Sequence, residues 1–153
     1  PLGQLFPEAI IDSAVDRAAL AKIVLADTQA LAKLEALVHP LVAEDREAFM
    51  LAAAQAGADA VVLDIPLLFE NGTEKFFDAT VVVSAPREVQ RSRVLARPGM
   101  SEEKFEAILR LQTPDEEKRQ RADYVIDTGL AMEETRAQVR SVYGEILKRI
   151  SDA

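Results

Sequence analysis

The stretch AVVLDIPLLFENG, residues 60–72, joins an uninterrupted apolar run to a Pro-Leu-Leu loop that ends at an acid, Glu70. A continuous apolar run of this length is typical of a strand covered on both faces, as the strands of parallel sheets are. We therefore predict a strand over residues 60–65. Because open α/β sheets bind their ligands at the carboxyl ends of the strands, the loop at 66–72 is the first candidate for a binding segment.

The segments outside this stretch alternate between strand and helix patterns. Two further strands are predicted at residues 79–84 (ATVVVS) and 123–127 (DYVID), and residues 1–12 are expected to be irregular. Helices are predicted from apolar spacing and capping residues at 16–26, 27–38, 40–55, 86–97, 101–112, 114–121 and about 130–150. This alternation predicts the α/β class with a parallel sheet flanked by helices.

Local signals set the ends of several of these helices. Asp27 is expected to cap the second helix, and Pro40 to interrupt it, because proline disfavours the α conformation at the residue before it. Thr113 and Glu116 have the spacing of a capping box, with Pro114 as the first helical residue.

The overall composition excludes several classes of protein. With 153 residues, 49% hydrophobic and 29% charged, the chain is long enough for one core, so we predict a single α/β body with a small subdomain. It has no cysteine and one histidine, which excludes a disulfide framework and leaves little for a zinc site. There is neither a membrane-spanning apolar run nor a signal-peptide pattern, so we expect a soluble cytoplasmic protein that does not bind a membrane.

The distribution of charge points to a local anion site. The formal net charge of −8 argues against broad nucleic-acid binding. Residues 87–121, however, hold seven Arg and two Lys against seven acids, a net charge of about +2. The basic residues therefore serve one region of an otherwise acidic chain.

Two interpretations stay open for the strand and loop at 60–72. Asp64 ends a VVLD pattern that resembles a Walker-B strand, in which the acid helps to hold Mg²⁺, but a strand-end Asp also commonly caps a turn. Leu67, Leu68 and Phe69 offer an apolar wall beside Glu70, as a mostly apolar ligand requires, or they belong to the core.

The arginines form two pairs with helical spacing, Arg93 with Arg97 and Arg87 with Arg91. A guanidinium group suits phosphate oxygens because it is planar, permanently charged and able to form two parallel bonds. Most such pairs are solvated surface, but Arg97 precedes a hinge-like Pro98-Gly99, and small phosphotransferases cover their nucleotide with mobile helices that carry arginine. His39 lies next to a proline with no carboxylate near it in sequence, and it is more typical of a structural residue than of a general base.

Taken in order, several motifs resemble the dephospho-coenzyme A kinase family, a family of P-loop kinases in coenzyme A biosynthesis. They are VDRAAL at 15–20, LEALVHPLV at 34–42, DIPLLFENG at 64–72, VQRSRVLAR at 89–97 and ILRLQTPDEEKRQRADYVIDTG at 108–129. The resemblance covers nearly the whole chain, and the order and spacing of the blocks make it specific.

The resemblance implies a P-loop fold of the nucleoside-monophosphate kinase type. It implies transfer of the γ-phosphoryl group of ATP, with Mg²⁺, to the 3′-hydroxyl of the adenosine ribose of dephospho-coenzyme A. Residues 1–153 would form a single, partial kinase domain. Its parts would be a helical acceptor-binding region at 13–57, a helical lid at 98–121, and a core at 58–97 and 122–153.

The resemblance also implies roles for individual residues. The acceptor site would use His39, Pro66, Leu68 and Glu70. Arg93 would reach the transferring phosphates as the catalytic residue, with Arg97 at the start of the lid and Gln112 at its far end. The loop at Thr128 and Gly129 would approach adenine through its backbone, since other members have Asn there. No metal ligand is assigned.

The chain departs from the family pattern in one respect. None of its six glycines forms the phosphate-binding motif G-x-x-x-x-G-K-S/T. The first strand, this loop and the family's catalytic aspartate are therefore expected before residue 1, and the 153 residues alone are not expected to phosphorylate a substrate. Two alternatives stay open: a related small-molecule kinase with another acceptor, and a truncated paralogue that binds a ligand or partner without catalysis. The sequence gives no prediction of the oligomeric state.

Overall fold

A computed structural model describes residues 2–152, and the chain divides into two compact units, Pro1–Val61 and Val62–Ala153. Each unit is described by itself below. Within residues 2–152, no helix combines the length and the apolar character that crossing a membrane requires.

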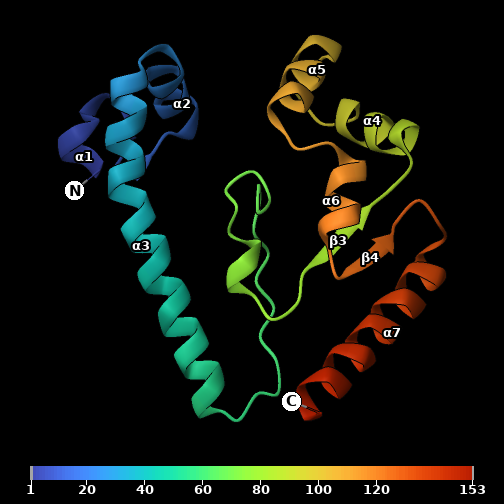
Figure 1. Cartoon of the computed structure of the whole chain (residues 1–153). Helices are drawn as coiled ribbons and strands as arrows, with labels where there is room; N and C mark the ends of the chain where they lie inside the picture. Colours follow the sequence, from blue (N-terminus) through green and yellow to red (C-terminus); the bar gives the residue numbers. More distant parts are fainter. Residues whose placement is uncertain (1, 153) are drawn as a thin grey trace. The chain divides into compact units, whose positions relative to one another are not determined.

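The first unit is mainly helical (Figure 1). Its elements are α1 (Leu2–Leu5), the 3-10 turn η1 (Pro7–Ala9), β1 (Ile10–Ile11), β2 (Ala14–Val15), α2 (Arg17–Ala26) and α3 (Thr28–Gln55). Its core brings the N-terminal segment against both long helices through Phe6, Ala9, Val24 and Ala30. The predicted cap at Asp27 is confirmed, because its side chain accepts the amide of Gln29 at 2.8 Å. Asp16 caps α2 in the same way and accepts the amide of Ala18 at 2.8 Å.

The start of the chain is more regular than its sequence predicts. β1 and β2 form a small antiparallel hairpin in which Ile11 pairs with Ala14. The two turn residues, Asp12 and Ser13, both have positive φ, 49° and 64°, which is the backbone pattern of a tight hairpin turn. The turn contains no glycine, so the usual sequence signal for such a hairpin is missing.

The predicted break at Pro40 is wrong. Helix α3 runs without interruption from Thr28 to Gln55 with Pro40 inside it. An interior proline costs about 3 kcal/mol because it removes one hydrogen bond and crowds the preceding turn. The residues on both sides of Pro40 are mostly Ala, Leu, Glu and Lys, which favour helix, and their propensity outweighs the single defect.

The second unit contains a parallel pair of strands, β3 (Val81–Ser84) and β4 (Tyr124–Asp127), in which Val81 pairs with Tyr124 and Ser84 with Asp127. Its other elements are the 3-10 turn η2 (Glu74–Phe76) and the helices α4 (Arg87–Leu95), α5 (Glu102–Leu111), α6 (Asp115–Arg121) and α7 (Met132–Ser151). The predicted α/β class with parallel strands is confirmed.

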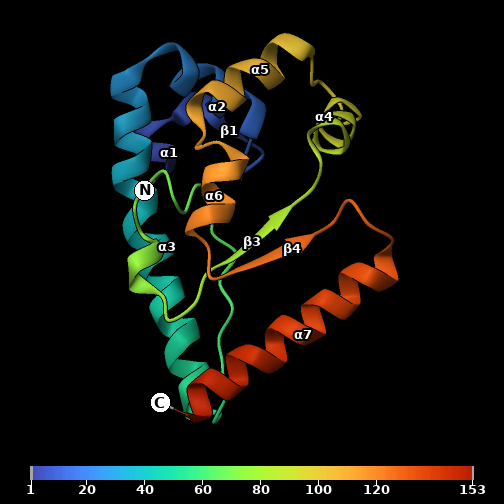
Figure 2. The same ribbon diagram turned by 45° about the vertical axis from the view of Figure 1, so that its right-hand side comes forward.

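Helices cover this strand pair on opposite sides. α6 contacts β3 and α7 contacts β4, and Figures 1 and 2 show the two helices on either side of the strands. Val82 and Ile126 are buried at 8% and 7% exposure. The two strands therefore end side by side at Ser84 and Asp127, where the loops of the candidate site begin.

The predicted strand over residues 60–65 is not formed. These residues belong to no helix or strand, Val62 is 84% exposed and Asp64 is also exposed. An apolar pattern creates a demand for burial, but a strand forms only beside a hydrogen-bonding neighbour. Among residues 2–152, β3 and β4 pair only with each other, and neither offers its free edge to 60–65.

Candidate functional site

The loops that follow β3 and β4 form the first part of the candidate site. Thr128 binds the carbonyl oxygen of Ser84 twice, from its amide at 2.8 Å and from its hydroxyl at 2.9 Å. Arg93 of α4 reaches the same loop, because its Nη1 donates to Thr128 Oγ1 at 3.1 Å and its Nη2 to the Thr128 carbonyl oxygen at 2.6 Å. The structure thus brings together Arg93 and Thr128, two residues predicted for the nucleotide side.

Arg93 differs from the other arginines of α4 in the partners that its charge has. Arg91 forms an ion pair with Glu102, and Arg87 lies 3.8 Å from Glu106. The bonds of Arg93 go to neutral oxygens, and no carboxylate within residues 2–152 pairs with it. Arg93 therefore keeps an oriented guanidinium group whose charge is open to an anion.

Gly129 is held in a crowded position beside α4. Its amide donates to Asp127 Oδ1 at 2.7 Å. A Cβ atom at this position would lie 2.3 Å from Cδ of Pro86, the residue that precedes α4. The loop after β4 can approach the start of α4 only because residue 129 has no side chain.

The segment predicted as a lid begins at Arg97 and the Pro98-Gly99 break. Arg97 is exposed, and Gly99 has a φ of 75°, a conformation that favours glycine. At the far end Gln112 follows α5, and its backbone amide donates to the Leu109 carbonyl oxygen at 3.2 Å. These two residues are not brought into contact with Arg93 by any hydrogen bond among the described residues.

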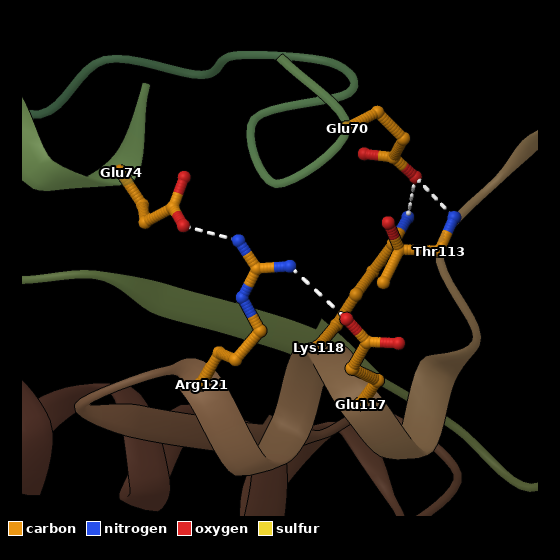
Figure 3. A network of polar contacts seen from close by, with 6 residues as sticks. All are labelled: Glu70, Glu74, Thr113, Glu117, Lys118 and Arg121. Carbon is orange, nitrogen blue, oxygen red and sulfur yellow. Dashed lines mark hydrogen bonds and ion pairs between the residues drawn. The ribbon is translucent and has the colours of Figure 1, made fainter. Parts of the chain in front are cut away.

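Glu70 connects the predicted acceptor loop to the start of α6 (Figure 3). Its Oε1 accepts the Thr113 amide at 2.8 Å and lies 2.8 Å from Nζ of Lys118. The predicted capping box is therefore wrong: Pro114 precedes α6 without a side-chain cap, and Glu70 from a distant loop receives the Thr113 amide instead. The side chains of Glu70 and Lys118 are only 14% and 21% exposed.

A second polar contact joins α6 to the 3-10 turn η2. Arg121 of α6 forms an ion pair with Glu74 of η2. It also pairs with Glu117 on its own helix at 3.1 Å. Its guanidinium carbon also lies 4.9 Å from the centre of the Phe69 ring, which is 6% exposed. This arrangement is a cation–π contact, in which Arg121 lies over the ring of Phe69.

Burial and ion pairing act in opposite directions on the Glu70 carboxylate. Desolvation raises its pKa, but the hydrogen bonds from Lys118 and the Thr113 amide, with the charge of Lys118, outweigh burial and leave the pKa below its ordinary 4.5. The pKa of Glu74 is lowered too, chiefly by the hydrogen bond from Arg121. Both carboxylates therefore stay ionised at neutral pH.

We expect Glu70→Gln to reduce the acid sensitivity of folding. Because the folded state lowers the Glu70 pKa, its contribution is complete above the ordinary value of 4.5 and is lost as pH falls through the lowered folded-state value. Urea unfolding from neutral pH to about pH 3 should give a shallower loss of unfolding free energy in the variant. Glu47→Gln on exposed α3 is the matched control, and equal pH slopes for all three proteins would contradict the prediction.

Asp115, the first residue of α6, attaches the start of this helix to β3 and to α4. Its Oδ2 accepts the hydroxyl of Ser84 at 2.7 Å, and its Oδ1 accepts Nε2 of Gln90 at 3.2 Å. A hollow of about 770 Å³ lies beside these residues, and Phe105 and Arg119 also line it. Both ends of α6 are thus bound to neighbouring elements of the unit.

The remaining predicted acceptor residues lie in two different units. Pro66 and Leu68 belong to the loop before Glu70, and the carbonyl oxygen of Leu68 accepts the Thr73 amide at 3.2 Å. His39 is exposed on α3 of the first unit.

Comparisons with known proteins agree with these motifs. A family model described as dephospho-CoA kinase matches residues 2–134. The chain belongs to the dephospho-CoA kinase family. A dephospho-CoA kinase of Mesorhizobium japonicum is 55% identical over 141 residues, which cover 92% of this chain and 72% of that protein. The predicted resemblance to dephospho-CoA kinases is confirmed.

Solved structures show the same relationship in three dimensions. The dephospho-CoA kinase from Campylobacter jejuni has a TM-score of 0.67 at 27% identity and covers 96% of this chain and 76% of its own. The Thermus thermophilus protein TT1252 has a TM-score of 0.73 at 42% identity, with 94% of this chain and 74% of that one covered.

The sequence did not predict four residues of the polar contacts around Glu70. They are Glu74, Thr113, Lys118 and Arg121. A weak signal does exist, since Lys118 and Arg121 share a helix face and Glu70 and Glu74 are spaced to match them. Nothing in the sequence shows that residues more than 40 positions apart form these pairs.

Proposed function

We propose that the protein transfers the γ-phosphoryl group of ATP to the 3′-hydroxyl of the ribose of dephospho-CoA, which yields CoA and ADP. The observation that carries this proposal is the family match over residues 2–134, with 55% identity to a dephospho-CoA kinase over 92% of the chain. The fold of the proposed enzyme is that of a P-loop kinase.

The donor side of the reaction is assigned to the loops after β3 and β4. Arg93 is held by Thr128 with its charge open, which suits a group that binds the phosphates of ATP. Attack of the ribose oxygen on the γ-phosphorus breaks the bond to the bridging oxygen of ADP, and negative charge builds on the transferring oxygens. Arg93 stabilises this charge, Arg97 and Gln112 bound the lid, and Thr128 and Gly129 approach adenine through their backbone.

The acceptor side is assigned to the loop at residues 66–72 of the second unit. Pro66 and Leu68 supply apolar contact, and Glu70 supplies a fixed carboxylate. The resemblance to the family also assigns an acceptor role to His39. This division of the chain follows the proposed acceptor region at 13–57, lid at 98–121, and core at 58–97 and 122–153.

The metal and the phosphate cradle are assigned to residues outside these 153. Within residues 2–152, no three His, Cys, Asp or Glu side chains gather into a group able to hold a metal ion. Asp64 is exposed and ends no strand, so it receives no role as a Mg²⁺ ligand. The family's P-loop and the aspartate that takes the proton of the ribose hydroxyl are likewise proposed for the full-length protein.

The full-length protein that carries these residues is expected to convert dephospho-CoA to CoA. With ATP and Mg²⁺, one CoA should form for each ADP released, measured by mass spectrometry and a coupled ADP assay. Adenosine and shikimate serve as control acceptors, with rates at least about 100-fold lower in kcat/KM expected.

Two outcomes would contradict the proposal. Preference for one of the control acceptors would identify a related kinase with another substrate. Tight binding of dephospho-CoA without formation of CoA would identify a non-catalytic module.

A further inference from the structure

The predicted acceptor loop holds a conformation that its own residues do not favour. Leu67 has a φ of 59°, in the left-handed region that a leucine rarely adopts. The loop closes on itself because the Asn71 amide donates to the Leu67 carbonyl oxygen at 3.1 Å and the Gly72 amide to that of Phe69 at 3.2 Å. Strained backbone of this kind persists where the surroundings impose it.

The Glu70 carboxylate attaches this loop to another part of the unit. Oε1 receives both donors, the Thr113 amide and Lys118 Nζ, each at 2.8 Å. Oε2 is buried and has no hydrogen-bond partner within residues 2–152. Two donors on one oxygen fix the direction of the carboxylate, and a buried second oxygen without a donor adds nothing to hold it.

Lys118 provides a fixed point of attachment. It lies on α6, whose first residue, Asp115, is bound to Ser84 of β3 and to Gln90 of α4. A second attachment of α6 to the loop region runs through Arg121 and Glu74. The bonds of α6 to β3 and α4 therefore fix the position of Lys118. Through its ion pair with Glu70, Lys118 in turn fixes the position of the loop.

We propose that Lys118 is a positioning residue for acceptor binding, which holds the loop at 66–72 in its binding conformation by fixing the Glu70 carboxylate. This inference rests on the proposed function, because the loop is assigned there to the dephospho-CoA site. Lys118 acts through Glu70 and is not assigned a contact with substrate.

The test compares variants of the full-length protein. Lys118→Met removes the charge and keeps the length, Lys118→Arg keeps a charged donor, and Lys148→Met makes the same change on the exposed face of α7. Lys118→Met should raise KM for dephospho-CoA by about 10-fold with kcat and KM for ATP changed by less than about 2-fold, because it removes binding and not transition-state stabilisation. Lys118→Arg should restore most of the affinity, and Lys148→Met should match the wild type.

Hydrogen exchange gives a readout that does not depend on activity. The amides of Asn71 and Gly72, which close the loop, should exchange faster in Lys118→Met than in the wild type, while amides in β3 stay protected. If Lys118→Met does not fold, Lys118→Gln, which keeps a neutral donor, should give the same pattern at smaller size.

The results separate this inference from the proposed function. If the wild type converts dephospho-CoA and Lys118→Met keeps its KM, the inference is overturned and the function stands. A rise in KM for ATP or a fall in kcat without a change in KM for the acceptor would also overturn it, because Lys118 would then act on the donor side. If the wild type shows no conversion, the proposed function fails, and faster loop exchange alone would support only the structural link.

Discussion

Arg93→Ala in the full-length protein is expected to lower kcat by more than about 100-fold, which corresponds to about 2.7 kcal/mol of lost transition-state stabilisation. The charge of Arg93 has no carboxylate partner within residues 2–152, and two bonds to Thr128 fix its guanidinium plane. A charge that is already oriented needs no rearrangement when the transferring phosphoryl group develops its own charge. Stopped-flow and steady-state assays with dephospho-CoA and ATP would measure the loss.

The same change should have little effect on folding. Arg93 is exposed and its bonds go to neutral oxygens, so its removal is expected to alter the unfolding free energy by less than about 1 kcal/mol. Arg93→Lys keeps the charge but loses the planar fork, and it should recover only part of the rate.

Arg87→Ala is the matched control on the same helix. The Arg87 side chain is 75% exposed and faces Glu106 at 3.8 Å, as a surface ion pair does. The Arg87→Ala substitution should leave kcat unchanged. If Arg93→Ala also kept its rate to within about 3-fold, Arg93 would belong with the solvated surface arginines and its proposed role would be wrong.

The sequence predicted those elements that depend on local patterns. The strands predicted at 79–84 and 123–127 are present as β3 and β4, and Asp27 caps α3 as predicted. Each of these features rests on residues within a few positions of one another. Two errors, at 60–65 and at Thr113, arose where the outcome depends on distant residues. The other two, at Pro40 and at the β1–β2 hairpin, concern local signals that neighbouring residues outweighed or that the sequence lacked. The run at 60–65 has the composition of a strand but lacks a neighbour among the described residues, and Thr113 gave its amide to Glu70 rather than to a local cap.

The candidate site was predictable to the same degree. The resemblance singled out Arg93 and Thr128, and the geometry places them in contact. The network of Lys118 and Arg121 was missed because its ion pairs join a loop to a helix more than 40 residues away. Glu70 was predicted as a substrate residue from its loop, while its attachment to α6 could be seen only in the structure.

Gly129→Ala is expected to destabilise the protein by about 2 kcal/mol, because an added Cβ would overlap the Pro86 ring. The overlap is severe: the new atom would lie 2.3 Å from Pro86 Cδ and 3.0 Å from Asp127 Oδ1. Neither neighbour can move freely, since Pro86 is a rigid ring at the start of α4 and Asp127 Oδ1 already accepts the Gly129 amide. Thermal unfolding should show a Tm lower by about 4–8 °C.

Gly144→Ala provides a control of opposite sign. Gly144 lies inside α7, and a Cβ there would meet no atom within 4 Å. Because glycine weakens a helix interior, this substitution should stabilise the protein by about 0.5–1 kcal/mol. The two substitutions therefore distinguish a steric clash at Gly129 from the loss of backbone freedom that any glycine substitution brings. A Gly129→Ala protein as stable as the wild type would mean that the loop after β4 can move away from α4. In that case Thr128 and Arg93 would no longer be held together by the packing of Gly129 against Pro86.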